Sequence, residues 1–408
     1  MALKKFWIMA YRDLMRNRRR TFFTLLAVAL GLALLIVMNG WIAGIMEDSL
    51  QNSIRLKSGH VQIRASTYEE KKLSLEWKDL LENADGWAAR ANQMAEVKVA
   101  APVLWAGGML NATDETAGVQ IYGIETTSSL YDPIRESLVG GEFLSPDDRN
   151  GILIGKRLAD SLGLGIGDKV NLAVVNADGQ ADQGNFTIRG LYTTGIIGYD
   201  DSAVFMPLEK AQAFTQTDGH ASAVVILLHQ QEDADKVAAA LMQPGVEALT
   251  WEDLNALFLQ TVQTGMSYYL LMDGIVMLVV VVIIINTLLM AVFERTREMG
   301  ILAALGMKGR QILGMIVFEA CLLGLAGIVL GIVIGSAGVG YLAVYGIDAS
   351  AAATAASNIT ISSTLHARFE PGGIASLSFW TLVIILLASL YPAWIAARME
   401  PVQALHTT

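Results

Sequence analysis

Four long uncharged stretches constrain the fold of this 408-residue chain more than any other feature. None of them contains Asp, Glu, Lys or Arg over 20 to 28 residues, and they are Thr21–Met46, Gly274–Phe293, Ala320–Ile347 and Pro371–Ala397. About 20 apolar residues cross the hydrocarbon core of a bilayer, whereas strands seldom exceed about ten residues. Gly274–Phe293 alone has 14 Val, Ile, Leu or Phe residues, which favours a membrane helix over a buried strand. The sequence therefore predicts four transmembrane helices.

Charge asymmetry predicts how these helices are oriented. Residues 1–20 carry seven Lys or Arg against one acid, and residues 294–311 carry Arg295, Arg297, Lys308 and Arg310. Residues 47–267 instead have 16 Lys or Arg and 31 Asp or Glu, a net charge of −15. Because basic flanks stay in the cytoplasm, we expect both termini and residues 294–311 to be cytoplasmic. Residues 47–267 are then extracytoplasmic.

These observations divide the chain into nine expected segments. The four transmembrane helices are placed at residues 21–46, 268–293, 312–345 and 374–397. The remaining segments are a basic amphipathic helix (1–20), an extracytoplasmic domain with helical stalks (47–267), a cytoplasmic loop (294–311), an outer loop (346–373) and a cytoplasmic C-terminus (398–408). The first helix is expected to be an uncleaved anchor, because its apolar run is too long for a signal peptide. Residues 1–20 are alternatively an ordinary juxtamembrane tail.

The domain at residues 47–267 is expected to be mixed α+β. Strand-like runs such as Lys169–Val175 and Phe186–Tyr192 alternate with helical patterns such as Lys156–Leu162, which ends on Gly163. Two subdomains are expected, one near residues 150–230 and one inserted around 60–140. The fold class is thus a four-helix membrane protein with a large mixed domain between its first and second spans.

Several chemistries are excluded by the residues present. Gly151–Arg157 is the nearest match to a phosphate-binding loop, but it has one residue too few between its glycines and Arg in place of Ser or Thr. The five histidines are not spaced as the ligands of a metal site, and they lie at His60, His220, His229, His366 and His406. The one cysteine, Cys321, lies in the third span, so no intrachain disulfide is expected.

The segment Glu294–Met307 is expected to be presented to a soluble partner at a membrane face. It lies between two apolar runs, and charged residues flank a small helical block at Met299–Leu305. Ile301, Leu302 and Leu305 are spaced to form one apolar face outside the membrane, and an exposed patch of this kind normally has a partner.

Polar and small residues within the spans suggest helix packing. Gly324, Gly327, Gly331 and Gly335, followed by Gly338, recur at three- and four-residue spacing, which lets another helix approach closely. Alternatively, these glycines leave a gap between helices that a substrate occupies. Glu319 and Asp273 are intramembrane acids with no basic partner in the spans, which favours helix-interface packing over a proton or ion pathway.

Four stretches resemble one family of membrane proteins. They are Arg12–Thr24, Gly155–Val170, Glu294–Met307 with Phe318–Ala320, and Tyr391–Leu405. Their order and spread resemble the permeases of the FtsX-like/MacB-type ABC transporter superfamily, especially the lipoprotein-releasing (Lol-type) permeases. The resemblance implies that the loop between spans two and three docks on a separate ATPase through a coupling helix.

The positions that match this coupling element are Glu294, Arg295, Arg297, Glu298, Met299, Gly300, Ile301, Leu302, Leu305 and Gly306. Ala303 stands where the family often has Arg or Lys. Docking is therefore expected to depend more on apolar contacts, or on Lys308 and Arg310.

The resemblance also implies a function in the bacterial inner membrane. Two permeases, identical or homologous, work with two cytoplasmic ABC ATPase subunits, which use the ATP and Mg, while this chain binds no cofactor and is not an enzyme. Its expected role is extraction or export of a hydrophobic or lipid-anchored substrate, as in lipoprotein release, by mechanical transmission. Membrane lipid and a periplasmic or outer-membrane protein are further expected partners, and nucleic acid is not. The alternatives are a signalling protein that activates an extracytoplasmic hydrolase, and a non-ABC membrane scaffold.

Overall fold

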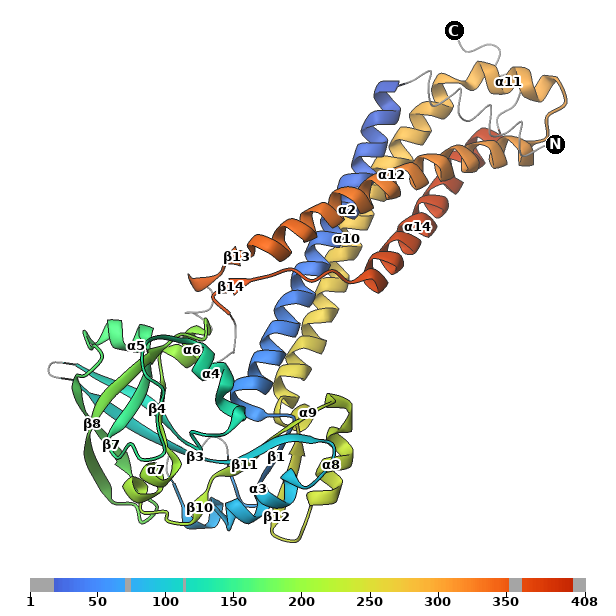
Figure 1. The fold of residues 1–408 in the computed structure, drawn as a ribbon. Coiled ribbons are helices and arrows are strands. Elements are labelled where there is room, and N and C mark those ends of the chain that lie inside the picture. The colour runs from blue at the N-terminus through green and yellow to red at the C-terminus, as the bar shows by residue number, and fades with distance from the viewer. Residues whose placement is uncertain (1–17, 70–74, 113–114, 352–361, 399–408) are drawn as a thin grey trace. The chain divides into compact units, whose positions relative to one another are not determined.

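The computed structural model describes residues 18–69, 75–112, 115–351 and 362–398 (Figure 1). The predicted amphipathic helix at residues 1–20 and the predicted C-terminus at 398–408 lie almost wholly outside the described residues. The chain forms two compact units. Unit 1 consists of Met1–Ile45, Val262–Ile347 and His366–Thr408, and unit 2 of Met46–Thr261 and Asp348–Leu365.

Four helices in the described part of the chain are long and apolar enough to cross a membrane. They are α2 (Arg18–Ser53), α10 (Ala256–Glu294), α12 (Gly309–Tyr345) and α14 (Pro371–Ala397). Their positions confirm the four-span prediction. The 39 residues of α10 extend roughly 58 Å at about 1.5 Å per residue, well beyond a hydrocarbon core of about 30 Å. The helices α2 and α10 therefore continue past the apolar runs, as the expected stalks require.

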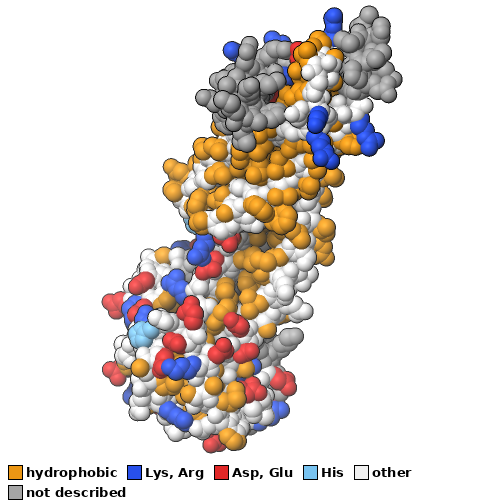
Figure 2. All heavy atoms as spheres, turned by 90° about the vertical axis from the view of Figure 1, so that its right-hand side faces the viewer, with side chains coloured by type: hydrophobic (Ala, Val, Ile, Leu, Met, Phe, Trp, Pro, Cys, Tyr) orange, Lys and Arg blue, Asp and Glu red, His pale blue; other side chains and the backbone are white. Residues whose placement is uncertain are grey.

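The four long helices share a core within unit 1. Its buried residues come from every one of them, and they are Val28, Val280, Ile284, Leu288, Ala320, Ile385 and Ala388. On the face shown in Figure 2, hydrophobic side chains cover most of the surface of these helices. This surface is what a lipid environment favours, because exposed apolar side chains on a spanning helix meet acyl chains rather than water. Asp and Glu gather instead over unit 2.

The segment between α12 and α14 carries two short strands, β13 (Ile347–Asp348) and β14 (Thr364–Leu365). Within unit 2, the amide of Ser363 donates to the carbonyl of Gly195 at 2.7 Å, and Ser362 forms a bridge with Ile196. Within unit 1, the amide of Arg368 donates to the carbonyl of Gly40 at 2.8 Å. Backbone hydrogen bonds therefore fix the described residues of this outer loop within each unit.

Unit 2 is built on one sheet of ten strands among its described residues. The strands are β1 (Val61–Ala65), β3 (Val97–Asn111), β4 (Thr116–Ile124), β5 (Leu138–Gly141), β6 (Gly151–Gly155), β7 (Lys169–Val175), β8 (Ala181–Tyr192), β9 (Ala203–Pro207), β11 (Ala223–Leu228) and β12 (Val246–Thr250). A separate pair joins β2 (Leu81–Glu82) to β10 (His220–Ala221).

The order of the main sheet is β12-β1-β11-β3-β4-β9-β6-β8-β5, and β7 pairs with both β3 and β8. Most pairs are antiparallel, whereas β4 with β9 and β6 with β8 are parallel. Strands from early and late parts of the chain are thus interleaved across the sheet. The expected division into subdomains near 60–140 and 150–230 is wrong, because long-range pairing unites both segments in one sheet.

Short helices cover this sheet. They are α3 (Ala84–Asn92), α4 (Asp132–Glu136), α5 (Lys156–Ser161), α6 (Ile197–Asp200), α7 (Leu208–Thr215), α8 (Ala234–Leu241) and α9 (Trp251–Leu254). Local sequence explains several boundaries. The Thr250 side chain and Asp253 form a capping box that starts α9. In the β7–β8 hairpin, the Asn176 side chain accepts hydrogen bonds from the amides of Asp178 and Gln180, and Gly179 adopts a positive φ of 78°.

Candidate coupling site

The loop between α10 and α12 contains a short helix, α11 (Thr296–Ala304). Its C-terminus is stopped by local sequence. Gly306 has a φ of 95°, its amide donates to Ala303 at 3.0 Å, and the amide of Met307 donates to Leu302 at 3.0 Å. This pair of hydrogen bonds is a Schellman motif, which requires a left-handed residue at the position of Gly306. The predicted coupling segment therefore forms a discrete helix with a fixed end.

One face of α11 is held by a small hydrophobic core. Met299 is buried together with residues that precede and follow the loop, and these are Val292, Ile312, Ile316, Ala393 and Ala396. Ala303 and Met307 pack against this core, and Gly300 is also buried. The helix is thus attached to α10, α12 and α14 through apolar contacts.

The opposite face of α11 is exposed. Ile301 is 46% exposed and Leu305 is 79% exposed, while Leu302 is half-buried. Ile301 and Leu305 are four residues apart and lie on the same side of the helix, and the amide of Leu305 donates to the carbonyl of Ile301 at 3.0 Å. The apolar face inferred from the sequence is therefore divided, since Leu302 turns partly toward the core.

The charged residues just before α11 and in its first turn also divide into two groups. Glu294, Arg297 and Glu298 are exposed. Arg295 is buried, and its Nη1 lies 3.6 Å from Oε2 of Glu319 on α12. The expectation that Glu319 finds no cation within the spans overlooked this arginine, which lies just beyond the end of α10.

The residues that start α12 remain available at the surface. Lys308 and Arg310 are both exposed, and the amide of Lys308 donates to the side-chain oxygen of Gln311 at 2.9 Å. This contact caps the first turn of α12. The two cations therefore flank the exposed apolar pair from the C-terminal side of the loop.

The glycine stripe on α12 lies against two other helices of unit 1. A Cβ at Gly327 would lie 2.7 Å from the Val28 side chain, and one at Gly335 would lie 2.9 Å from Ile36. The other stripe positions also lie close to a neighbour: Gly331 to Ala29 and Leu32, Gly338 to Val37, and Gly324 to Ile385 of α14, all within 2.8 to 3.1 Å. The structure thus brings α2 against most of the stripe, which leaves no room there for a substrate.

Asp273, the second intramembrane acid, has a polar partner. The Asn39 side chain on α2 donates to Asp273 on α10, at 3.3 Å to Oδ2 and 3.5 Å to Oδ1. Asn39 also donates to the carbonyl of Leu35 at 2.9 Å. This arrangement joins two helices and is consistent with a packing contact.

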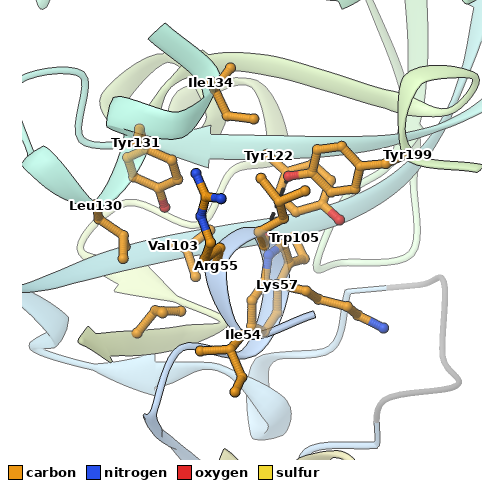
Figure 3. Close-up of a pocket in the computed structure, with 12 residues that line it drawn as sticks. Ile54, Arg55, Lys57, Val103, Trp105, Tyr122, Leu130, Tyr131, Ile134 and Tyr199 are labelled. Carbon is orange, nitrogen blue, oxygen red and sulfur yellow. Dashed lines mark hydrogen bonds between the residues drawn. The ribbon is translucent and has the colours of Figure 1, made fainter. Parts of the chain in front are cut away.

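Unit 2 contains a small cavity next to the turn that follows α2 (Figure 3). Aromatic residues and two cations of that turn line it, among them Trp105, Tyr122, Tyr131, Tyr199, Arg55 and Lys57. The Tyr199 hydroxyl donates to the carbonyl of Leu56 at 3.1 Å. Burial raises the pKa of Tyr122, Tyr131 and Tyr199, so these phenols are neutral. The cavity volume of about 20 Å³ is close to that of one water molecule.

The segment nearest to a phosphate-binding loop in sequence has a different structure. Gly151–Gly155 forms the buried strand β6, whose backbone pairs with β8 and β9 rather than forming a loop that cradles phosphate. No group of three or more His, Cys, Asp or Glu with metal-binding geometry occurs in the part of the chain that the structure describes.

Comparisons with known proteins agree with this arrangement. Residues 21–243 match the family model of the MacB-like periplasmic core domain, and residues 271–401 match the model of the FtsX-like permease C-terminal region.

Three curated proteins are similar over most of this chain. The lipoprotein-releasing system transmembrane protein LolC of Neisseria meningitidis is 23% identical over 96% of this chain and 95% of its own length. LolE of Haemophilus influenzae is 23% identical over 94% of each chain. The macrolide export ATP-binding/permease protein MacB of Nitrobacter winogradskyi is 25% identical over 97% of this chain but only 59% of its own length.

Proposed function

Because this chain belongs to the MacB-like and FtsX-like family of ABC transporter permeases, we propose that it couples ATP hydrolysis on a separate ATPase subunit to extraction or export of a hydrophobic or lipid-anchored substrate. It is a membrane protein with a periplasmic-type domain between its first and second spans. In this proposal the domain lies outside the inner membrane and α11 lies inside the cell.

The observation that carries the proposal is the exposed apolar face of α11. Ile301 and Leu305 are exposed at the end of a helix whose other face is packed against α12 and α14. A soluble partner that buries Leu305 gains roughly 1.5–3 kcal/mol from the removal of that side chain from water. Four exposed charged residues surround this pair and would orient the partner as it docks, namely Arg297, Glu298, Lys308 and Arg310.

The proposed substrate class follows from where apolar surface is available. The cavity of about 20 Å³ beside the turn after α2 is far too small for an acyl chain. Two larger hollows of unit 2, of about 90 and 130 Å³, are lined mainly by polar residues and do not suit an acyl chain. The long helices, in contrast, carry exposed hydrophobic side chains along their length. The names of the relatives point the same way, since LolC and LolE belong to lipoprotein-releasing systems and MacB to macrolide export.

The proposal includes an assembly of two permeases and two ATPase subunits. The permease copies are identical or homologous, and ATP and Mg bind only to the ATPase subunits. A second copy would cover part of the exposed apolar surface of α10, where Leu270, Leu271 and Ile275 are among the exposed residues. A periplasmic or outer-membrane protein that receives the substrate completes the proposed pathway.

The test replaces the exposed apolar residue of α11 by a charge. Leu305→Asp places a carboxylate in the proposed interface, and the affinity for the partner ABC ATPase should fall by at least tenfold, since about 1.4 kcal/mol corresponds to tenfold. Met242→Asp is the matched control, because Met242 is 59% exposed on unit 2 and lies outside the coupling segment.

Both variants are purified, and ATPase binding is measured by titration in nanodiscs. The proposal predicts loss of binding for Leu305→Asp alone, with normal thermal unfolding of both variants. Wild-type affinity in Leu305→Asp, or vigorous ATP hydrolysis by the purified chain without any ATPase subunit, would contradict it. ATP-dependent activation of an extracytoplasmic hydrolase without substrate movement would support the signalling alternative instead.

A further inference from the structure

The corner between α10 and α11 is formed around a buried arginine. The amide of Arg295 donates to the carbonyl of Val292 at 3.2 Å, and its own carbonyl accepts from the amide of Met299 at 2.9 Å. The same residue therefore ends one helix and starts the next. Its side chain is only 4% exposed, so the guanidinium is directed into the protein rather than toward a soluble partner.

The acid that meets this arginine comes from the third turn of α12. Glu319 lies ten residues after Gly309, which is about 15 Å along the helix at about 1.5 Å per residue. Its side chain is 5% exposed, and its Oε2 lies 3.6 Å from Nη1 of Arg295. Because both charges are removed from water, loss of either one leaves the other in an unfavourable environment. The ion pair therefore connects the corner between α10 and α11 to a position well inside the length of α12.

The inner face of α11 thus makes two different contacts with α12. Met299 lies one turn after Arg295 on the same face, and it packs in a core with Ile312 and Ile316. Apolar packing of this kind is non-directional and tolerates small rotations. The Arg295–Glu319 ion pair, with Nη1 and Oε2 3.6 Å apart, adds a second point of attachment one turn before Met299 on the same face, which restricts rotation of α11. The apolar contact therefore holds α11 close, and the ionic contact determines its angle.

We propose that Arg295 and Glu319 are a positioning pair that fixes the angle of α11 on α12 and so transmits movement of the docked ATPase into the membrane helix. This inference rests on the proposed function. It assigns docking to the exposed residues Ile301 and Leu305, and transmission to the buried pair. Arg295 is therefore separated from the exposed charges Glu294, Arg297 and Glu298, with which it is contiguous in sequence.

The experiment separates docking from transmission. The permease in nanodiscs is titrated into its partner ABC ATPase, and ATP hydrolysis is followed. The permease concentration at half-maximal stimulation reports docking, and the maximal rate reports transmission. Arg295→Met and Glu319→Gln should each lower the maximal rate at least about fivefold, the lower end of typical allosteric coupling. The half-maximal concentration should change by less than about twofold, as expected for residues outside the interface.

A double variant distinguishes positioning from a purely structural role. Arg295→Met with Glu319→Leu replaces both charges by apolar side chains, which commonly restores or raises the stability of a buried site. We expect this double variant to regain the thermal stability of the wild type while its maximal rate stays low. Recovery of the maximal rate together with stability would overturn the inference, and so would single variants with wild-type maximal rates.

Two controls complete the design. Asp273→Asn removes a different carboxylate from the spanning helices, one bound to Asn39, and should keep the wild-type maximal rate. Arg295→Lys keeps the charge but loses the planar fork, and its rate should lie between those of the wild type and Arg295→Met. If the wild-type permease itself neither binds nor stimulates the ATPase, the proposed function fails, which is distinct from a failure of the positioning pair.

Discussion

A Cβ atom placed on Gly44 of α2 would lie 2.0 Å from the carbonyl oxygen of His366, which is too close for any residue other than glycine. The segment that leads into α14 therefore lies directly on α2 at this point. Two residues after His366, the amide of Arg368 donates to the carbonyl of Gly40, one turn earlier on α2. Both glycines therefore allow a polypeptide backbone to lie directly on the surface of a long helix.

We predict that Gly44→Ala displaces this segment and destabilises unit 1. In an open helix position the same change stabilises by about 1 kcal/mol, but overpacking against a backbone costs about 1–3 kcal/mol. Gly340→Ala on α12 is the matched control, because no atom lies within 4 Å of a Cβ there. Thermal unfolding in detergent should show a lower midpoint for Gly44→Ala than for Gly340→Ala. Equal midpoints would show that His366 moves away without cost.

The glycine stripe makes a second prediction. Gly331→Val should destabilise the protein by about 1–3 kcal/mol, because a Cβ at Gly331 already lies 3.0 Å from the Ala29 carbonyl oxygen and the Leu32 side chain. Gly314→Val introduces the same side chain into α12 at a position with no atom within 4 Å. Denaturation of the two variants side by side measures the difference. The close approach of α2 to α12 would be refuted if both variants unfolded alike.

Membrane topology can be measured with single cysteines. Cys321 is the one cysteine of the sequence, so Cys321→Ala gives a cysteine-free background. Gln180→Cys and Lys308→Cys place thiols at exposed positions in unit 2 and in the loop before α12. The charge asymmetry predicts that an impermeant maleimide labels Gln180→Cys in intact spheroplasts and Lys308→Cys only after permeabilisation. The reverse pattern would exclude the four-span orientation given above.

The stability of unit 2 should depend on the protonation of His60. Its Nδ1 accepts a hydrogen bond from the amide of Leu228 at 2.9 Å, and burial lowers the pKa of His60 below its usual value of 6.5. Because the folded state favours the neutral ring, the contribution of His60 to the free energy of unfolding is fully present above pH 6.5. It is lost as pH falls through the lower pKa of the folded state.

His60→Gln keeps an acceptor but cannot titrate in this range. Thermal unfolding measured between pH 7.5 and 5 should therefore show a steeper loss of stability for the wild type than for His60→Gln. Parallel curves would mean that the Leu228 hydrogen bond does not depend on the charge of His60.

The parts of the fold that depend on local composition could be predicted from the sequence. Hydropathy adds up over about 20 residues, which makes the spans evident from the sequence, and the strand predicted at Lys169–Val175 has the bounds observed for β7. The helix α3 is not evident from the sequence, because the apolar face of Ala84–Asn92 consists largely of small alanines and the segment includes Gly86, which lowers helix propensity. The sheet order depends on long-range pairing, which a single sequence does not reveal.

In the candidate coupling site, too, local features could be predicted from the sequence and long-range contacts could not. The sequence predicts a helical block at Met299–Leu305, whereas the observed helix α11 begins earlier, at Thr296, and ends at Ala304. Which charged side chain turns inward depends on the register of α12 against the corner at Arg295, and this is a property of tertiary packing. One signal was available, because an acid within a spanning helix requires a partner and Arg295 is a cation at the adjacent helix end.

The bridge between Ser362 and Ile196 has a practical consequence for dissection of the molecule. Unit 2 takes its chain from two separate stretches, Met46–Thr261 and Asp348–Leu365. A soluble fragment cut at residues 46 and 261 lacks Ser362 and Ser363, so it loses the amide that donates to the Gly195 carbonyl and the hydroxyl that accepts from Asn52. Supplying Asp348–Leu365 as a peptide, or joining it by a linker, would restore these contacts, and the affinity of that peptide would measure directly how strongly the segment is held.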